Sequence, residues 1–196
     1  ALPTPYIMVD EAKLIRNLEI LKSVINRTGC KILLAQKAFS MFSLYPKIRE
    51  YLHGTTASGL YEAKLGFEKM GGETHVYSPA FDPLEFMEIA AICDHVVFNS
   101  FNQWDKFGKI ALGAGCICGI RINPECSTQE HEIYDPCSSG SRLGVPICGF
   151  AGELPDGISG LHFHTLCEQN ADALVKTLSA VEERFGKFWW RSPYNA

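Results

Sequence analysis

The sequence lacks the features that mark membrane, secreted and nucleic-acid-binding proteins. No stretch approaches eighteen consecutive apolar residues, and residues 1–10 contain no basic region followed by an apolar core, so neither a membrane span nor a secretory signal is indicated. No run of five like charges occurs, and the net charge is −4, which argues against a nucleic-acid-binding surface. We therefore expect a cytoplasmic protein with a small-molecule partner that contacts neither nucleic acid nor membrane.

Cysteine is abundant, but its spacing indicates neither a disulfide framework nor a metal centre. The eight cysteines are scattered through 196 residues, and most lie in apolar strings, where a reduced thiol behaves as a small hydrophobic group. One residue separates Cys116 from Cys118, whereas zinc and redox motifs place two or more residues between their thiols. We expect reduced core cysteines and no bound metal.

Short β-rich runs alternate with longer amphipathic runs along the chain. Strands are expected at residues 5–10, 31–36, 54–59, 74–80, 95–100, 116–125 and 157–164. Helical segments follow them, the first with Asp10 as its N-cap, the second broken at Pro46, and the fourth capped by Asp82 with Pro83 at its first position. This alternation predicts parallel βαβ units, and hence an α/β fold.

The absence of a glycine-rich turn decides between the α/β architectures. No phosphate-binding turn of that kind follows the first strands, which disfavours a doubly wound nucleotide-binding sheet and favours a (β/α)₈ barrel. In such barrels the reactive side chains lie at the carboxyl ends of the strands. The residues at those expected ends are Lys37, Ser58, Ser78, Asn99, Arg121, Asn123, His162 and His164.

Four of these strand-end residues have a structural and a chemical interpretation. Lys37 either packs its stem and extends its ammonium into water or acts as a nucleophilic amine that condenses with an aldehyde. His162 and His164 are expected on one face of their strand. They could be core histidines whose hydrogen bonds are satisfied, or rings against which a flat cofactor packs. They could also be metal ligands, although no further ligand follows at a matching spacing. Arg121 either pairs with a carboxylate or supplies a fixed cation beside a cofactor oxygen.

Five segments, taken in order, resemble one enzyme family. The segments "LLAQKAFS", "TASGLYEAKLG", "RINPE", "DPCSSGSRLG" and "GLHFHTLCEQNADAL" are similar to the carboxynorspermidine decarboxylases. These belong to the pyridoxal-phosphate decarboxylases with an alanine-racemase-like barrel, as do the ornithine and diaminopimelate decarboxylases. The resemblance implies a homodimeric lyase of polyamine biosynthesis that converts carboxynorspermidine or carboxyspermidine to norspermidine or spermidine.

The resemblance also implies roles for individual residues. Lys37 matches the lysine that holds pyridoxal 5'-phosphate covalently, His164 the histidine that stacks on its pyridine ring, and Arg121 an arginine of the cofactor's surroundings. Ser58 and Glu62 lie in a motif near the cofactor, with packing as an equal alternative. The acidic residues that would face a carboxylated triamine, or would form only a solvated loop, are Glu125, Glu130, Glu132 and Asp135.

The resemblance covers residues 3–188 and implies a chain about twice as long. We therefore expect a partial cofactor-binding barrel domain over residues 1–188, without the C-terminal strands and β domain of the family, and an atypical tail over residues 189–196. The glycine-rich loop that binds the cofactor phosphate and the substrate-binding residues of the family would lie beyond this chain, which leaves its own activity open. The alternatives are a related decarboxylase or racemase of the diaminopimelate or ornithine type, and a non-catalytic fragment.

Overall fold

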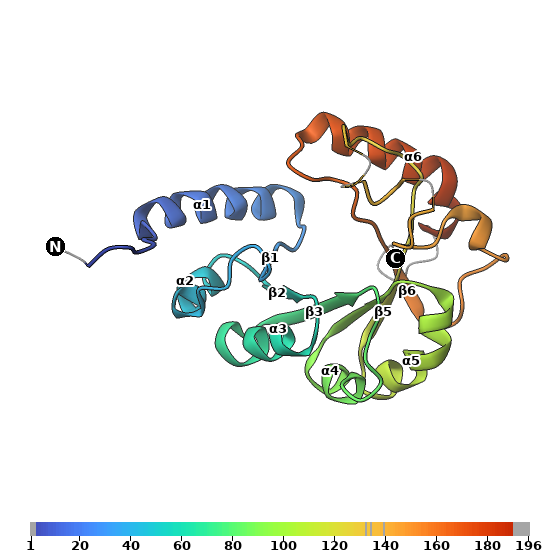
Figure 1. The fold of residues 1–196 in the computed structure, drawn as a ribbon, viewed down its shortest axis with the longest axis horizontal. Coiled ribbons are helices and arrows are strands. Elements are labelled where there is room, and N and C mark those ends of the chain that lie inside the picture. The colour runs from blue at the N-terminus through green and yellow to red at the C-terminus, as the bar shows by residue number, and fades with distance from the viewer. Residues whose placement is uncertain (1–2, 132, 134, 139, 190–196) are drawn as a thin grey trace.

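The sheet consists of six parallel strands that follow one another in chain order. The computed structural model describes residues 3–131, 133, 135–138 and 140–189. The strands are β1 (Leu33–Ala35), β2 (Gly54–Ala57), β3 (Glu73–Ser78), β4 (His95–Phe98), β5 (Ile117–Arg121) and β6 (Ile158–His162). Each strand pairs with the next, in the order β1-β2-β3-β4-β5-β6 (Figure 1). An order without reversal is that of a barrel and not of a doubly wound sheet, so the expected incomplete (β/α)₈ barrel is confirmed.

The helices are α1 (Glu11–Thr28), α2 (Tyr45–Arg49), α3 (Leu60–Leu65), α4 (Phe86–Ile92), α5 (Phe101–Gly113) and α6 (Ala171–Trp189), with a π-helical turn over Gly66–Met70 and 3₁₀ turns over Phe42–Leu44 and Ile147–Gly149. Helices α2 to α5 lie between successive strands in the chain, α1 precedes the first strand, and α6 follows the last. Helices α3, α4 and α5 follow one another along the sheet in Figure 1. Each helix in the described part of the chain is too short or too polar to cross a lipid bilayer.

The core lies between the sheet and helices α3 to α5. Phe86 of α4 and Phe98 of β4 are completely buried, and the ring of Phe86 lies 4.4 Å from that of Phe107 of α5, measured between centroids. Burying one such side chain contributes roughly 1.5–3 kcal/mol. A separate cluster around Val181 and Phe185 fixes α6 against the end of β5. These contacts hold the carboxyl ends of the central strands in place.

Two helix boundaries agree with the sequence analysis. Asp10 is the N-cap of α1, because its carboxylate accepts a hydrogen bond from the Lys13 amide at 3.1 Å. Pro46 lies in the first turn of α2, directly after the 3₁₀ turn over Phe42–Leu44. A proline is tolerated in a first turn because the amide it lacks would have no partner within the helix, so it separates the two elements as expected.

Two local predictions are wrong. Residues 5–10 form no strand, and Ile7 is 91% exposed, because no neighbouring strand among the described residues pairs with this backbone. Asp82 does not cap a helix that begins at Pro83. Its carboxylate accepts a hydrogen bond from the Leu84 amide at 2.9 Å within a turn, and α4 begins only at Phe86.

The cysteines are all free thiols, as expected, but only three are core residues. Cys93, Cys116 and Cys118 are buried at the α4–β5 side of the sheet, and burial raises the pKa of Cys93 and of Cys118 to about 12. The exposed cysteines are Cys30, Cys148 and Cys167, and the partly buried ones are Cys126 and Cys137. The prediction of core positions fails for these five, because none of them belongs to the cluster of buried residues between the sheet and helices α3 to α5.

Candidate functional site

The carboxyl ends of β3, β5 and β6 bring three side chains into one layer. The guanidinium carbon of Arg121 lies 4.8 Å from the centroid of the Tyr77 ring. The same ring stacks on His162, with 5.3 Å between centroids and 21° between planes. Arg121 also donates a hydrogen bond from Nη2 to the backbone carbonyl of His164 at 3.2 Å. Arg121 therefore fixes the segment that follows β6 and orients His164.

The charge of Lys37 acts on the histidines at this end of the sheet. Burial lowers the pKa of His162 to about 4, and the charges of Arg121, His164 and Lys37 add to the effect. The pKa of His164 is also lowered, first by burial of part of the ring, although the residue reaches the surface, and then by Lys37 and Arg121. Lys37 and Arg121 therefore both act electrostatically on His164, and a shared role of the three residues in holding the cofactor stays a prediction.

Two buried polar atoms of this layer have no hydrogen-bond partner within the described residues. They are Nε of Arg121 and Nδ1 of His162. An unsatisfied buried polar group costs about 1–3 kcal/mol, so these two nitrogen atoms favour a polar partner at this place. A flat, anionic aldehyde such as pyridoxal 5'-phosphate would meet an exposed amine, a fixed guanidinium and two imidazoles here, and the residues present fit that group.

Tyr77 is a residue of the layer that the sequence analysis missed. It named the next residue, Ser78, whose hydroxyl donates to the carbonyl of Ala80 at 3.0 Å and so only shapes a loop. The Tyr77 hydroxyl donates to Oδ1 of Asn99 at 2.8 Å. Strand alternation was an available signal, because only one of residues 77 and 78 faces the same side of the sheet as Arg121.

Asn99 links this layer to the long loop after β5. Its Oδ1 also accepts from the Gly144 amide at 2.9 Å, and its Nδ2 donates to the carbonyl of Arg142 at 2.9 Å. The side-chain oxygen of Asn123, another strand-end residue, accepts a hydrogen bond from the Glu125 amide at 2.8 Å. The backbone N–H of Asn123 donates to the carbonyl of Val145. Both asparagines therefore position the loop through their side chains.

The motif that contains Ser58 and Glu62 supports the turn at Lys37. The Glu62 carboxylate accepts a hydrogen bond from the Ser58 amide at 2.6 Å at the start of α3. The Glu62 backbone carbonyl accepts from Nε2 of the buried Gln36 at 2.8 Å, and Tyr45 donates to Oε1 of Gln36 at 3.1 Å. These contacts favour the packing interpretation and fix the residue directly before Lys37.

The acidic residues after β5 have mostly local contacts. The Glu125 carboxylate pairs with Arg184 at 3.4 Å, and the Asp135 carboxylate accepts from the Cys137 amide at 2.8 Å. Glu130 is exposed. Glu132 lies outside the described residues, as do residues 190–196 of the expected tail. A role for these carboxylates in substrate binding stays a prediction.

Comparisons with known proteins identify relatives over half of their length. No family model matches the chain. The chain is 44% identical to a carboxynorspermidine/carboxyspermidine decarboxylase of Campylobacter jejuni over 94% of its own length and 48% of that protein. It is 39% identical to a carboxyaminopropylagmatine decarboxylase of Synechocystis sp. over 96% of its own length and 49% of that protein.

Solved structures agree with these matches. A crystal structure of carboxynorspermidine decarboxylase from Campylobacter jejuni, complexed with norspermidine, matches with a TM-score of 0.85 and 41% identity over 95% of this chain and 47% of that one. A diaminopimelate decarboxylase from Helicobacter pylori, at 16% identity and a TM-score of 0.71 over 89% of this chain and 48% of that one, shares the fold alone. The chain spans about half the length of the curated relatives it matches, and over that half it is similar to the carboxynorspermidine/carboxyspermidine decarboxylases.

Proposed function

We propose that this chain carries the cofactor-binding lysine of a pyridoxal-phosphate-dependent decarboxylase that acts on carboxynorspermidine or carboxyspermidine. One observation carries the proposal: Lys37, Arg121, His162 and His164 follow or end strands at the same carboxyl edge of the parallel sheet, where two buried nitrogen atoms have no partner among the described residues. The similarity to decarboxylases with those names supports it. Because the chain spans about half of these relatives, the activity of the whole enzyme is part of the proposal.

Each residue would make a separate contribution. When bound, pyridoxal 5'-phosphate supplies an aldehyde that condenses with amines and a ring that takes up the electrons left on Cα when carbon dioxide departs. The exposed amine of Lys37 would hold the cofactor covalently. His164 would pack against the cofactor ring. Arg121 would supply a fixed positive charge, since the Tyr77 ring and the His164 carbonyl hold its guanidinium in place.

The lowered pKa values of His162 and His164 keep both imidazoles neutral near pH 7. Neutral rings add no positive charge beside the Lys37 amine. They can also accept or donate one hydrogen bond each, according to tautomer. The layer therefore combines one permanent cation, Arg121, with two uncharged rings.

The substrate class follows from the relatives. The Campylobacter jejuni structure was solved with norspermidine, and the Synechocystis relative is named for carboxyaminopropylagmatine, which makes that compound the second candidate. Measuring the rate of carbon dioxide release from carboxynorspermidine, carboxyspermidine and carboxyaminopropylagmatine in turn would identify which of the three is the substrate. We also propose a homodimer in the cytoplasm as the active form, by analogy with the family that the sequence resembles.

The lysine assignment is tested by trapping the cofactor on the protein. Pyridoxal 5'-phosphate added to the chain should produce a visible absorbance that borohydride converts to a stable adduct, and peptide mass spectrometry should locate the adduct on Lys37. Lys37→Ala should abolish this labelling. The control is Lys109→Ala, on the exposed surface of α5, which should label as the wild type does. Unchanged labelling of Lys37→Ala would refute the assignment.

A further inference from the structure

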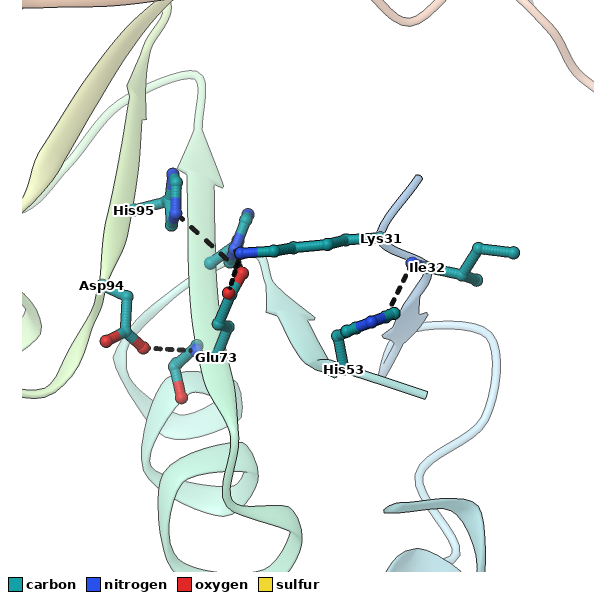
Figure 2. A network of polar contacts seen from close by, with 8 residues as sticks. Lys31, Ile32, His53, Glu73, Asp94 and His95 are labelled. Carbon is teal, nitrogen blue, oxygen red and sulfur yellow. Dashed lines mark hydrogen bonds and ion pairs between the residues drawn. The ribbon is translucent and has the colours of Figure 1, made fainter. Parts of the chain in front are cut away.

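A second polar cluster lies at the amino end of the sheet, opposite the Lys37 site. Glu73 and His75 belong to β3, and His95 is the first residue of β4. His75 and His95 are register partners in the parallel β3–β4 pair, and their rings stack with 3.9 Å between centroids and 20° between planes. Figure 2 shows Glu73, His95 and the Lys31 side chain converging on one point.

The donor atoms of this cluster have the spacing of a metal site. Oε2 of Glu73 lies 3.0 Å from Nε2 of His75 and 4.0 Å from Nε2 of His95, and one ligand atom from each residue lies within 4.8 Å of the others. Zinc binds nitrogen and oxygen ligands at about 2.1 Å in a tetrahedron, which places neighbouring ligand atoms roughly 3.4 Å apart. The two distances to Glu73 Oε2 bracket that value.

We propose that Glu73, His75 and His95 bind a divalent transition-metal cation, such as Zn²⁺, at a site separate from the Lys37 layer. Two imidazoles and one carboxylate form a donor set that favours such cations over calcium and magnesium, which prefer oxygen ligands. The sequence analysis expected no metal, because it weighed only the Cys116/Cys118 and His162/His164 pairs, neither of which has a further ligand at a matching spacing. Of the three donors proposed here, only Glu73 and His75 are close in sequence. The third donor comes from the next strand, which the sheet register places beside them.

The site leaves room for a further ligand. His75 and His95 line a cavity of about 300 Å³, which Val97, Gly119 and His162 also line. Gly119 has no side chain to fill this space. Three protein donors, of which the two histidines line a cavity, leave a coordination position for a water molecule or a small anion. The cavity extends from the amino-end cluster to His162, which belongs to the Lys37 site.

Lys31 would compete with a metal ion for the Glu73 carboxylate. Its ammonium pairs with Oε1 of Glu73, and its side chain is 57% exposed, so it can move into water when a metal ion binds. The neighbouring strand ends are held independently of it. The Asp94 carboxylate accepts from the Thr74 amide at 2.8 Å, and Nδ1 of His53 accepts from the Ile32 amide at 3.3 Å (Figure 2). Removing the Lys31 charge should therefore strengthen metal binding without unfolding the site.

The test is a titration of the full chain with Zn²⁺ alone, followed by calorimetry, and with Co²⁺, followed by its visible absorbance. One equivalent should bind to the wild type. Glu73→Gln, His75→Gln and His95→Gln should each weaken binding by roughly tenfold or more, since loss of a ligand costs at least as much as loss of an outer-shell partner. His131→Gln, in an exposed loop, is the matched control and should bind as the wild type does.

Lys31→Ala gives a second, independent result. It should bind Zn²⁺ more tightly than the wild type, because the carboxylate of Glu73 loses its competing partner. Absence of binding in both the wild type and Lys31→Ala would overturn the proposal. So would wild-type affinity in a folded Glu73→Gln/His75→Gln/His95→Gln variant, or a thiolate-to-cobalt absorbance, which would assign the metal to cysteines instead.

Discussion

Arg121 is a buried cation in the layer that it forms with Tyr77 and His162, and it pairs with no carboxylate among the described residues. It is only 4% exposed, and its described contacts are an aromatic ring and a backbone carbonyl rather than a carboxylate. A buried charge is costly unless it is paired. An anionic ligand would complete its surroundings, which is why the unsatisfied Nε of Arg121 supports a phosphorylated cofactor at this place.

At the same scale, His164 should matter for the cofactor and little for the fold. Its side chain reaches the surface, so His164→Ala should change the free energy of unfolding by only about 0.5 kcal/mol. The rate at which pyridoxal 5'-phosphate is lost on dilution should rise, because the packing ring is gone. Thermal denaturation and the visible absorbance measure the two effects. Marked thermal destabilisation with intact cofactor retention would instead identify His164 as a packing residue.

At the scale of elements, the loop after β5 depends on one close backbone approach. Gly144 has φ +83°, and a Cβ at this position would lie 2.7 Å from the carbonyl carbon of Ile122. Its amide donates to Asn99, which in turn accepts from Tyr77. The loop and the layer of Tyr77, Arg121 and His162 are therefore coupled through a position where only glycine fits.

Gly144→Ala should accordingly lower the free energy of unfolding and also weaken cofactor binding at the layer of Tyr77, Arg121 and His162. The left-handed conformation alone costs an alanine about 1–2 kcal/mol, and the contact with Ile122 adds to this. Gly140→Ala is the matched control, because Gly140 has φ +79° with no atom near its Cβ position. Urea unfolding should show a larger loss for Gly144→Ala, and only that variant should lose cofactor affinity. Equal losses in both variants would contradict the coupling.

At the scale of the whole molecule, buried neutral histidine makes stability depend on pH. Burial and the nearby Arg121, His164 and Lys37 lower the pKa of His162 from 6.5 to about 4. Between these values the unfolded chain binds a proton that the folded chain does not. The free energy of unfolding therefore falls as pH falls from 6.5 towards 4, by about 3 kcal/mol at most for this residue.

Urea unfolding at a series of pH values measures this effect. The free energy of unfolding should decline from pH 7 to pH 4.5, and His162→Gln should reduce the slope over this interval, because glutamine takes up no proton. His131→Gln, in an exposed loop, should keep the wild-type slope. A slope in His162→Gln equal to that of the wild type would show that His162 is not the residue responsible.

Much of the fold was predictable because its signals are local. The α/β alternation, the Asp10 cap and the six strands of the sheet follow from periodicity and capping chemistry within short windows. The errors arose where the local sequence favours an element that the surrounding structure does not support. Residues 5–10 have the composition of a strand but no neighbour among the described residues, and Asp82 stabilises a turn in place of a helix.

The sequence by itself determined the succession of elements, the candidate residues at the strand ends and the similarity to the decarboxylases. The tertiary structure alone decided which side chains meet: Tyr77 with Arg121 and His162 at the carboxyl end, and His95 with Glu73 and His75 at the amino end. The physical reason is that periodicity encodes the face of a strand on which a residue lies. Its neighbours across the sheet depend on parallel register and on packing between segments far apart in the chain.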